Sequence, residues 1–472
     1  MAVAGMMAAT GLALVGSSSP AAGEPAASCL AWSGNDSTTL RIYVAGVDGS
    51  DRLEVSTVGA DPDPEFSQHV AWSPDGTRIA WSGNDGSTPQ IYVADIDGAN
   101  RVEISTVGAD PDPETNILPA WSPDGSKIAW SAFDGPDRHI FVADPDGTGR
   151  TIVSSVGADP DPTDNQTPVW SPDGSRISWS GTGVAGQRIF AANADGTDRI
   201  ELSSVDDGFD PGVSIYSAWS PDGSRILFDG NDSSSVRQIW VADADGTNRD
   251  VVSTVGAGAD PTNNRFPTWY PDGTKVAWSG EIGPDKHVFV ADADGSSRSI
   301  ISNVGAGADP TDNQQPKFTP DGTLVAWDGD DGSTRQVYVA KPDGTDRYVA
   351  STPSGEAFPS FNFGPEWSPG CFEALLPVPN LDCHSESAVE PEAFGISTGF
   401  GCTVTTVSDV STTNSTVLVE AGGRQLLLAR ISVPIWQRAL ESGDTCRLPD
   451  GTRTQDTTVL SLLFRSYVIC RA

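Results

Sequence analysis

The chain has 472 residues, a formal net charge of −36 and a pI near 4.1. Its 50 Gly and 35 Pro separate short β-branched and aromatic runs, which favours an all-β fold over an α/β fold. Such an acidic surface keeps a protein soluble and monomeric and repels nucleic acid and anionic membranes. We therefore expect a monomer with neither of these as a partner.

Residues 1–23 are typical of an export signal. The run from Met1 to Gly16 is small and apolar, and Ala21-Ala22-Gly23 offers a signal-peptidase site, although no Lys or Arg precedes Arg41. No apolar run is long enough to cross a bilayer as a helix. Six cysteines, an even number, fit an oxidising compartment. We expect a periplasmic or secreted protein without a membrane span.

The motif Trp-Ser-Pro-Asp-Gly organises the next 300 residues. It begins at Trp72 and returns every 49 or 50 residues, with altered copies at Trp269 and Phe318 and a broken copy at Trp367. Between copies the same three further strand patterns recur, I-A-W-S-G, I-Y-V-A-D-x-D-G and R-x-x-I-S, separated by turn residues. Pro fixes φ, Asp bonds its own backbone and Gly accepts positive φ, so these turns are tight. Four short strands in a period near 50 residues predict a β-propeller blade.

The copy number predicts seven blades. The first I-A-W strand, at Trp32, has no W-S-P strand before it, and the last W-S-P strand, at Trp367, has no I-A-W strand after it. We expect the two ends to share one blade, because this closes the ring and removes exposed strand edges. The propeller is predicted over residues 24–370, closed by N- and C-terminal strands.

The tandem pattern W-S-P-D-G-x-x-I-A-W followed by I-Y-V-x-D-x-D-G resembles the repeat of TolB-like propellers, over residues 30–370. The resemblance implies a β-propeller and, because TolB is periplasmic, an exported protein. It leaves the function open, since propellers of this repeat serve as scaffolds, peptidases and polysaccharide-degrading enzymes. The chain differs from the TolB pattern in its seven copies and in having no room for an α/β domain in front.

Acidic residues gather in the links predicted on one face of the ring. A ring of carboxylates could hold Ca²⁺ or attract a cationic partner. Alternatively, Asp-Pro only initiates a turn and faces water, and the spacing matches no twelve-residue calcium loop. The candidate binding residues are Asp61, Asp63, Asp110, Asp112, Asp159, Asp161, Asp210, Asp260 and Asp309.

Groups suited to catalysis are sparse, and we name no catalytic residue. His139 and His287 fall at one repeat position, where other blades carry Gln or Arg, which favours a structural polar slot over a metal or catalytic site. We expect an exported, non-catalytic propeller that binds or scaffolds a protein partner. The alternatives are a propeller-fold hydrolase or lyase acting on peptide or polysaccharide, and a calcium-dependent surface binding protein. No cofactor is expected beyond that calcium.

Residues 371–472 hold five of the six cysteines and predict a small β-rich domain stapled by disulfides. Strands are predicted near 403–408, 415–420, 424–431 and 458–469, and a short helix from Pro434 to Gly443.

One disulfide is predicted at the split blade. When this blade is laid over an intact one, Cys29 and Cys371 fall on either side of one hairpin turn, within the spacing that a disulfide requires. The alternative is a lipidated Cys29, but Ala26-Ala27-Ser28 lacks the usual large aliphatic residue. Two further bonds, in an order left open, would join Cys383, Cys402, Cys446 and Cys470.

Overall fold

The computed structural model describes residues 29–35, 39–50, 52–57, 66–84, 88–106, 113–155, 161–184, 186–203, 213–254, 260–303, 310–351 and 361–369, and seven strands between residues 406 and 470. The chain forms two compact units, Met1–Leu376 and Pro377–Ala472. Every regular element in the described ranges is a β-strand, so the expected all-β class is confirmed. The same ranges contain no helix long and apolar enough to cross a membrane.

The first unit is built from groups of four antiparallel strands that follow the repeat. The innermost strands end at the repeated Trp or Phe and are β4 (Phe66–Trp72), β8 (Glu114–Trp121), β12 (Thr163–Trp170), β16 (Ser217–Trp219), β20 (Thr262–Trp269), β24 (Thr311–Phe318) and β28 (Phe361–Trp367). The second strands are β1 (Cys29–Asn35), β5 (Arg78–Asn84), β9 (Ile128–Asp134), β13 (Arg176–Gly183), β17 (Arg225–Asn231), β21 (Lys275–Ile282) and β25 (Val325–Asp330).

The third and fourth strands complete each group. The third strands are β2 (Leu40–Gly46), β6 (Gln90–Asp95), β10 (Asp137–Ala143), β14 (Gly186–Asn193), β18 (Arg237–Asp243), β22 (Asp285–Asp292) and β26 (Arg335–Ala340). The outer strands have two residues each and are β3 (Leu53–Glu54), β7 (Val102–Glu103), β11 (Thr151–Ile152), β15 (Ile200–Glu201), β19 (Asp250–Val251), β23 (Ser299–Ile300) and β27 (Tyr348–Val349).

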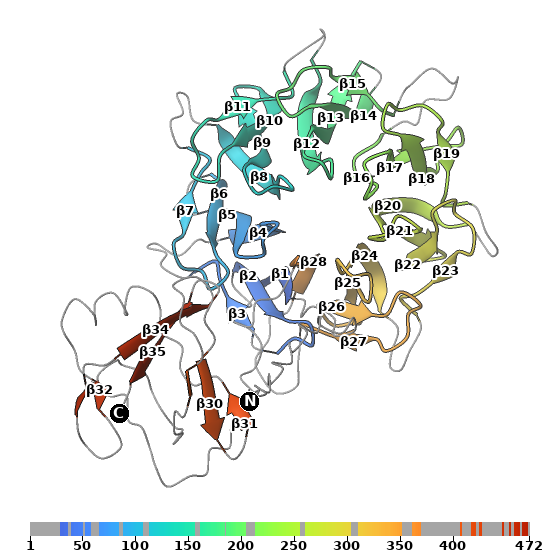
Figure 1. Cartoon of the computed structure of the whole chain (residues 1–472). Coiled ribbons are helices and arrows are strands. Elements are labelled where there is room, and N and C mark those ends of the chain that lie inside the picture. Colours follow the sequence, from blue (N-terminus) through green and yellow to red (C-terminus); the bar gives the residue numbers. More distant parts are fainter. Residues whose placement is uncertain are drawn as a thin grey trace, which may run out of the picture. The chain divides into compact units, whose positions relative to one another are not determined.

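Four of these groups are separate four-stranded sheets, and the remaining strands form one twelve-stranded sheet. Single parallel bridges, Leu40 with Phe66 and Arg335 with Phe361, join three antiparallel groups within that larger sheet. One of the three has the order β28-β1-β2-β3, so strands from both ends of the repeat pair, as the split motif predicts. Figure 1 shows the groups of this unit around a central axis, with the innermost strands nearest to it.

The core lies between neighbouring groups. A Trp from the middle of six second strands is fully buried, for example Trp81 and Trp130, and each stacks on an aromatic residue of the adjacent third strand, Tyr92 and Phe141 in these two cases. Alternate residues of the second and third strands pack against opposite neighbours, so these strands are buried on both faces. The hydrophobic effect therefore fixes the spacing between groups as well as the packing within each.

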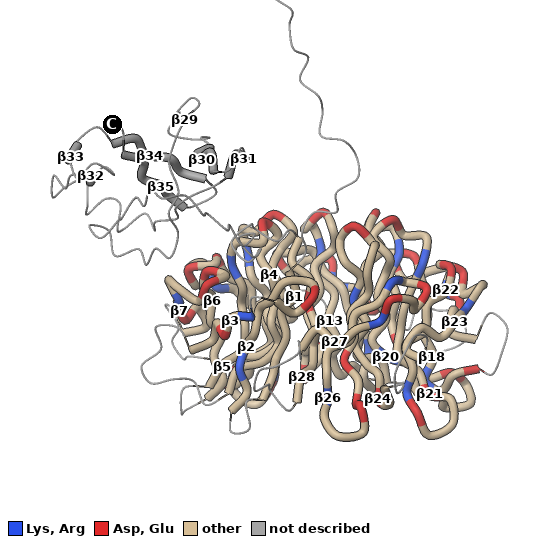
Figure 2. Tube along the Cα trace, turned by 90° about the horizontal axis from the view of Figure 1, so that it is seen from below, with Lys and Arg blue, Asp and Glu red and all other residues tan. Residues whose placement is uncertain are grey.

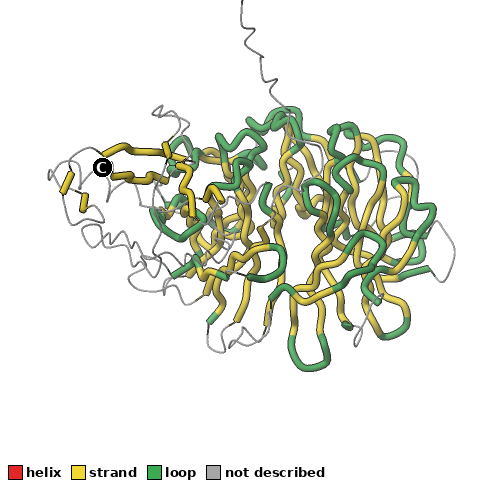
Figure 3. The backbone as a smooth tube through the Cα atoms, turned by 60° about the horizontal axis from the view of Figure 1, so that its bottom comes forward, coloured by secondary structure: helices red, strands yellow, loops and turns green. Residues whose placement is uncertain are grey.

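Within the described ranges, turns join consecutive strands of a group (Figure 3). In the Ser-Pro-Asp-Gly turn, Asp75 Oδ1 accepts hydrogen bonds from Ser73 Oγ and from the Thr77 amide, and Gly76 has a φ of 67°. These are the roles that the sequence assigns to Asp and Gly.

The second unit contains β29 (Thr406–Val407), β30 (Val417–Ala421), β31 (Arg424–Leu426), β32 (Cys446–Arg447), β33 (Arg453–Thr454), β34 (Thr457–Leu462) and β35 (Arg465–Cys470). The prediction of one strand over 458–469 is wrong: β34 and β35 are two antiparallel strands, with Leu462 opposite Arg465. A two-stranded pair exchanges backbone hydrogen bonds that one long strand could not make alone. The predicted helix at 434–443 lies outside the described residues.

Candidate functional site on the inner strands

Two of the nine predicted acidic binding residues lie in the described part, and both are paired with arginine. Asp161 accepts a hydrogen bond of 2.7 Å from Arg199, and Asp260 lies 3.4 Å from Arg298. Each arginine is almost fully buried and also donates to a serine carbonyl of the preceding group. Both carboxylates thus stabilise a contact between groups. The others, Asp61, Asp63, Asp110, Asp112, Asp159, Asp210 and Asp309, lie outside the described residues.

Within the described ranges, no three His, Cys, Asp or Glu side chains come together in a way that could hold a metal ion. The calcium hypothesis therefore rests on the acidic links that are not described.

The opposite face, formed by the turns, carries a larger set of exposed acids in the described part (Figure 2). Hydrogen bonds from Ser122 and Ser220 hold the pKa of Asp124 and Asp222 at about 2, so both are ionised at neutral pH. The exposed turn aspartates are Asp48, Asp75, Asp97, Asp124, Asp146, Asp173, Asp195, Asp222, Asp245, Asp272, Asp294, Asp321 and Asp343. Their Oδ1 atoms hold the turns together, for example by accepting the Thr148 amide at Asp146.

In six of the groups, the arginine of the R-x-x-I-S motif donates a hydrogen bond to the group before it. Arg150 Nη1, for example, donates to the Ser105 carbonyl at 2.6 Å, and the guanidinium lies 5.8 Å from the centre of the Phe141 ring. The equivalent donors are Arg101, Arg199, Arg249, Arg298 and Arg347.

An asparagine near the start of the inner strand makes a second repeated connection. Asn165 Oδ1 accepts the indole hydrogen bond of Trp179 at 2.8 Å, while its Nδ2 donates to the Arg138 carbonyl of the preceding group. The equivalent residues are Asn116, Asn264, Asn313 and Asn362. The other two groups carry Ser67 and Ser214 at this position.

Immediately after this position the inner strand departs from regular geometry. In six of the seven inner strands the register shifts here, and the second of two residues has a positive φ, for example Leu118 at 59° and Phe266 at 55°. No two groups carry the same pair, although the first residue is Gln in three groups and Ile in two. We term these the inner-ring residues: Gln68 and His69, Ile117 and Leu118, Gln166 and Thr167, Ile215 and Tyr216, Arg265 and Phe266, Gln314 and Gln315, and Phe363 and Gly364. All are partly buried.

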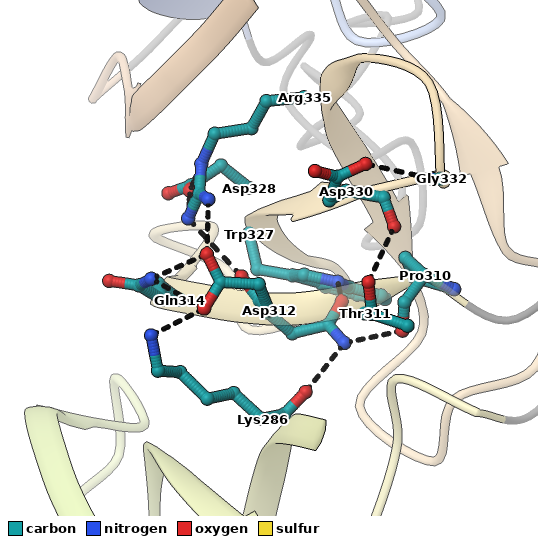
Figure 4. A network of polar contacts seen from close by, with 11 residues as sticks. Lys286, Pro310, Thr311, Asp312, Gln314, Trp327, Asp328, Asp330, Gly332 and Arg335 are labelled. Carbon is teal, nitrogen blue, oxygen red and sulfur yellow. Dashed lines mark hydrogen bonds and ion pairs between the residues drawn. The ribbon is translucent and has the colours of Figure 1, made fainter. Parts of the chain in front are cut away.

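Two groups carry a buried aspartate where the others have the serine of I-A-W-S-G. The first, Asp328, is 1% exposed and pairs with Arg335, which also contacts Asp312 at 2.7 Å (Figure 4). Lys286 of the preceding group forms a second ion pair with Asp312, and Gln314 donates to the same carboxylate at 3.1 Å. Burial raises the pKa of Asp328 to about 6. Two cations and two carboxylates make this network neutral when all are ionised.

The second buried aspartate, Asp229, lies two groups earlier. Its Oδ2 accepts from Arg237 at 2.9 Å, and its Oδ1 accepts the Ile215 and Tyr216 amides at 2.8 Å each. Burial raises the pKa of Asp229, and the charges of Arg237 and Arg265 oppose this shift. Arg265 belongs to the next inner strand, so the charges of two guanidinium groups act on this carboxylate, and the described ion pair is the one with Arg237.

His139 takes the structural role expected of its repeat position. His139 Nδ1 lies 3.3 Å from Ser154 Oγ, and at the equivalent position Gln90 accepts from Ser105 at 2.6 Å. The polar slot predicted for His139 is confirmed by this equivalence. His69, an inner-ring residue, lies 3.4 Å from Ser82 Oγ, and burial lowers its pKa to about 4.

The sequence prediction missed both aspartate clusters. The sequence does contain a signal for these clusters. Asp229 and Asp328 occupy a repeat position that is serine in the other groups, and an arginine follows each within eight residues.

Comparison with known proteins agrees with the repeat. Residues 93–262 match the family model described as the TolB beta propeller domain. A search of curated proteins gave no match.

Several solved structures are similar to this chain at low identity. TolB from Acinetobacter baumannii is 19% identical with a TM-score of 0.41, and the match covers 57% of this chain and 61% of that one. A putative TolB from Agrobacterium tumefaciens is 20% identical with a TM-score of 0.38 and coverages of 59% and 89%. An oligogalacturonate lyase from Vibrio parahaemolyticus is 14% identical with a TM-score of 0.48 and coverages of 66% and 85%. The expected resemblance is confirmed: residues 93–262 carry the repeat of the TolB beta propeller domain.

Proposed function

We propose that this chain is an exported seven-bladed propeller that binds a protein partner through its inner-ring residues, without catalysing a reaction. The count of seven blades is supported by the seven inner strands, each followed in hydrogen-bonding order by three others. The export proposal rests on residues 1–23 and on the TolB-like repeat, whose namesake is periplasmic.

The observation that carries the binding proposal is the contrast within each blade. The Trp, the asparagine connection and the outer arginine recur around the ring, whereas the inner-ring residues change in size, charge and polarity from blade to blade. Repeated framework residues stabilise the ring. A set of unlike, partly exposed side chains on adjacent rigid strands is what selective recognition of one partner needs.

Site-specific photo-crosslinking tests this function. A benzoylphenylalanine at Thr167, on the inner ring, should give a discrete adduct when the purified protein is mixed with envelope and culture-medium fractions of its source. The matched control places the same residue at Thr148, which is exposed in a turn. Equal adducts at both positions, or none at Thr167, would contradict the proposal.

A propeller-fold hydrolase or lyase is the second candidate. The network of Lys286, Asp312, Asp328 and Arg335 favours it, because unlike charged groups near a carboxyl group of raised pKa are typical of acid-base catalysis. Cleavage of a peptide or polysaccharide that Asp312→Asn abolishes would establish it.

A calcium-dependent surface role is proposed for the acidic links. We expect Ca²⁺, if it acts there, to raise the melting temperature and EDTA to reverse the effect. A melting temperature unchanged by either would remove calcium from consideration.

A further inference from the structure

The cluster around Asp229 differs from the one around Asp328 in its balance of charge. In the Asp328 network, Asp312 supplies a second carboxylate that pairs with Arg335 and Lys286. The residue at the position of Asp312 in the earlier blade is Val213, which is 39% exposed and has a φ of 46°, close to the 48° of Asp312. The second carboxylate is therefore missing at this position.

Arg265 adds a second positive charge to this cluster, whose one carboxylate is that of Asp229. In the described part of the chain no ion pair joins its guanidinium to an acid, and its Nε is buried without a hydrogen-bond partner. Arg237 already uses the single carboxylate, Asp229, whose other oxygen accepts two backbone amides. A guanidinium group that is partly removed from water gains most from a planar anion that accepts two hydrogen bonds.

Two aromatic residues lie near Arg265: Phe266 follows it in β20, and Tyr216, which directly precedes β16, is close enough for the charge of Arg265 to act on its hydroxyl group. The rings of Tyr216 and Phe266 are 4.3 Å apart at their centroids, and both residues, like Arg265, are partly exposed. Flat apolar groups next to an arginine suit a ligand that carries a carboxylate beside an apolar side chain.

We propose that Arg265, with Tyr216 and Phe266, forms a site for a carboxylate-bearing segment of a partner polypeptide. This inference rests on the proposed binding function and names the chemistry of the partner at that surface. Because the whole chain carries a charge of −36, the attraction is local, and it weakens as salt is added.

The test uses the full-length protein and a fluorescein-labelled hexapeptide of alternating Glu and Phe, with a Gln-for-Glu peptide as the neutral probe. We expect the Glu peptide to bind about tenfold more tightly than the Gln peptide, the difference of one charge-assisted pair. Arg265→Gln should remove that preference. Gln occupies the equivalent position at 68, 166 and 314, so the fold should tolerate it.

A control variant separates local recognition from the overall charge of the protein. Lys341→Gln removes one charge from the exposed turn face and should leave binding unchanged.

Equal binding of the Glu and Gln peptides, or unchanged affinity in Arg265→Gln, would overturn the inference. Binding of tri-galacturonate without binding of either peptide would also overturn it, because the carboxylate would then belong to a saccharide. An adduct at Thr167 together with failure of the peptide test would leave the proposed binding function standing and this site rejected.

Discussion

Ser67 and Trp81 form a mismatch within an otherwise repeated framework. In five blades an asparagine accepts the hydrogen bond of the buried indole. In a sixth blade Ser214 replaces the asparagine, but Phe228 also replaces the Trp, so no indole donor is left without a partner. In the blade of Ser67 the Trp remains, and both Trp81 Nε1 and Ser67 Oγ are buried without a partner. An unmade hydrogen bond at a buried group costs about 1–3 kcal/mol.

Ser67→Asn should therefore raise the free energy of unfolding by about 1 kcal/mol, measured by urea denaturation. The segment Asp-Pro-Asp-Pro-Glu precedes both Ser67 and Asn116, so the local chain already suits asparagine. The reverse change, Asn116→Ser, is the control and should destabilise. An unchanged free energy of unfolding in Ser67→Asn would show that the asparagine connection does not stabilise the protein.

His69 predicts a pH dependence of stability. Its pKa is about 4 when folded and about 6.5 when unfolded. The unfolded chain thus binds more protons between these values, and stability is lost as pH falls from 6.5 towards 4, at most about 1.4 kcal/mol per pH unit. His69→Gln copies the residue at the equivalent Gln315 and should flatten this part of the curve. Urea denaturation of the native protein and of His69→Gln at pH 4.5 and 7 measures this dependence. The same loss of stability in both proteins would contradict its assignment to His69.

At the scale of the elements, adjacent blades are joined by the outer arginines as well as by the core. Arg150→Gln removes the bond to the Ser105 carbonyl and the contact with the Phe141 ring. We expect a loss of about 1–2 kcal/mol, together with faster amide exchange in β7 and β11, the two outer strands that it connects. Lys341→Gln removes an exposed ion pair and is the control: it should change neither the free energy of unfolding nor the amide exchange of these strands. Exchange that rises evenly over the whole ring would argue against a local connection.

The sequence predicted those elements whose signal is local. The tight turn at Asp75 and Gly76 and the pairing of β28 with β1 follow from turn chemistry and from counting copies. The inner-strand irregularity at Leu118 has no such signal, because a bulky residue rarely takes a φ of 59° and only the surrounding ring holds it there. The charge clusters depend on residues from adjacent strands and blades, which a repeat brings together only after it folds.

At the scale of the whole molecule, the ring is closed where the chain is interrupted. The Cys29 amide donates to Ser368 Oγ and the Ser368 amide donates to the Cys29 carbonyl, each at 3.0 Å. Cys29 is disulfide-bonded. Cys371, three residues beyond Ser368, is the partner that the sequence predicts.

Cys371→Ser should therefore destabilise the protein by up to roughly 5–6 kcal/mol, the chain-entropy value for so long a loop. Non-reducing peptide mapping of the native protein should first show the Cys29–Cys371 peptide pair. Cys29 joined to Cys383 or any other cysteine, or carrying a lipid, would refute the prediction.

The binding surface of the whole ring is tested most directly by hydrogen–deuterium exchange of the full chain, alone and with the partner captured at Thr167. We predict that the partner slows exchange on the inner strands, above all around Thr167 and at Arg265 and Phe266, and leaves the outer strands unchanged. Protection confined to the outer strands or to residues 377–472 would contradict the proposed function.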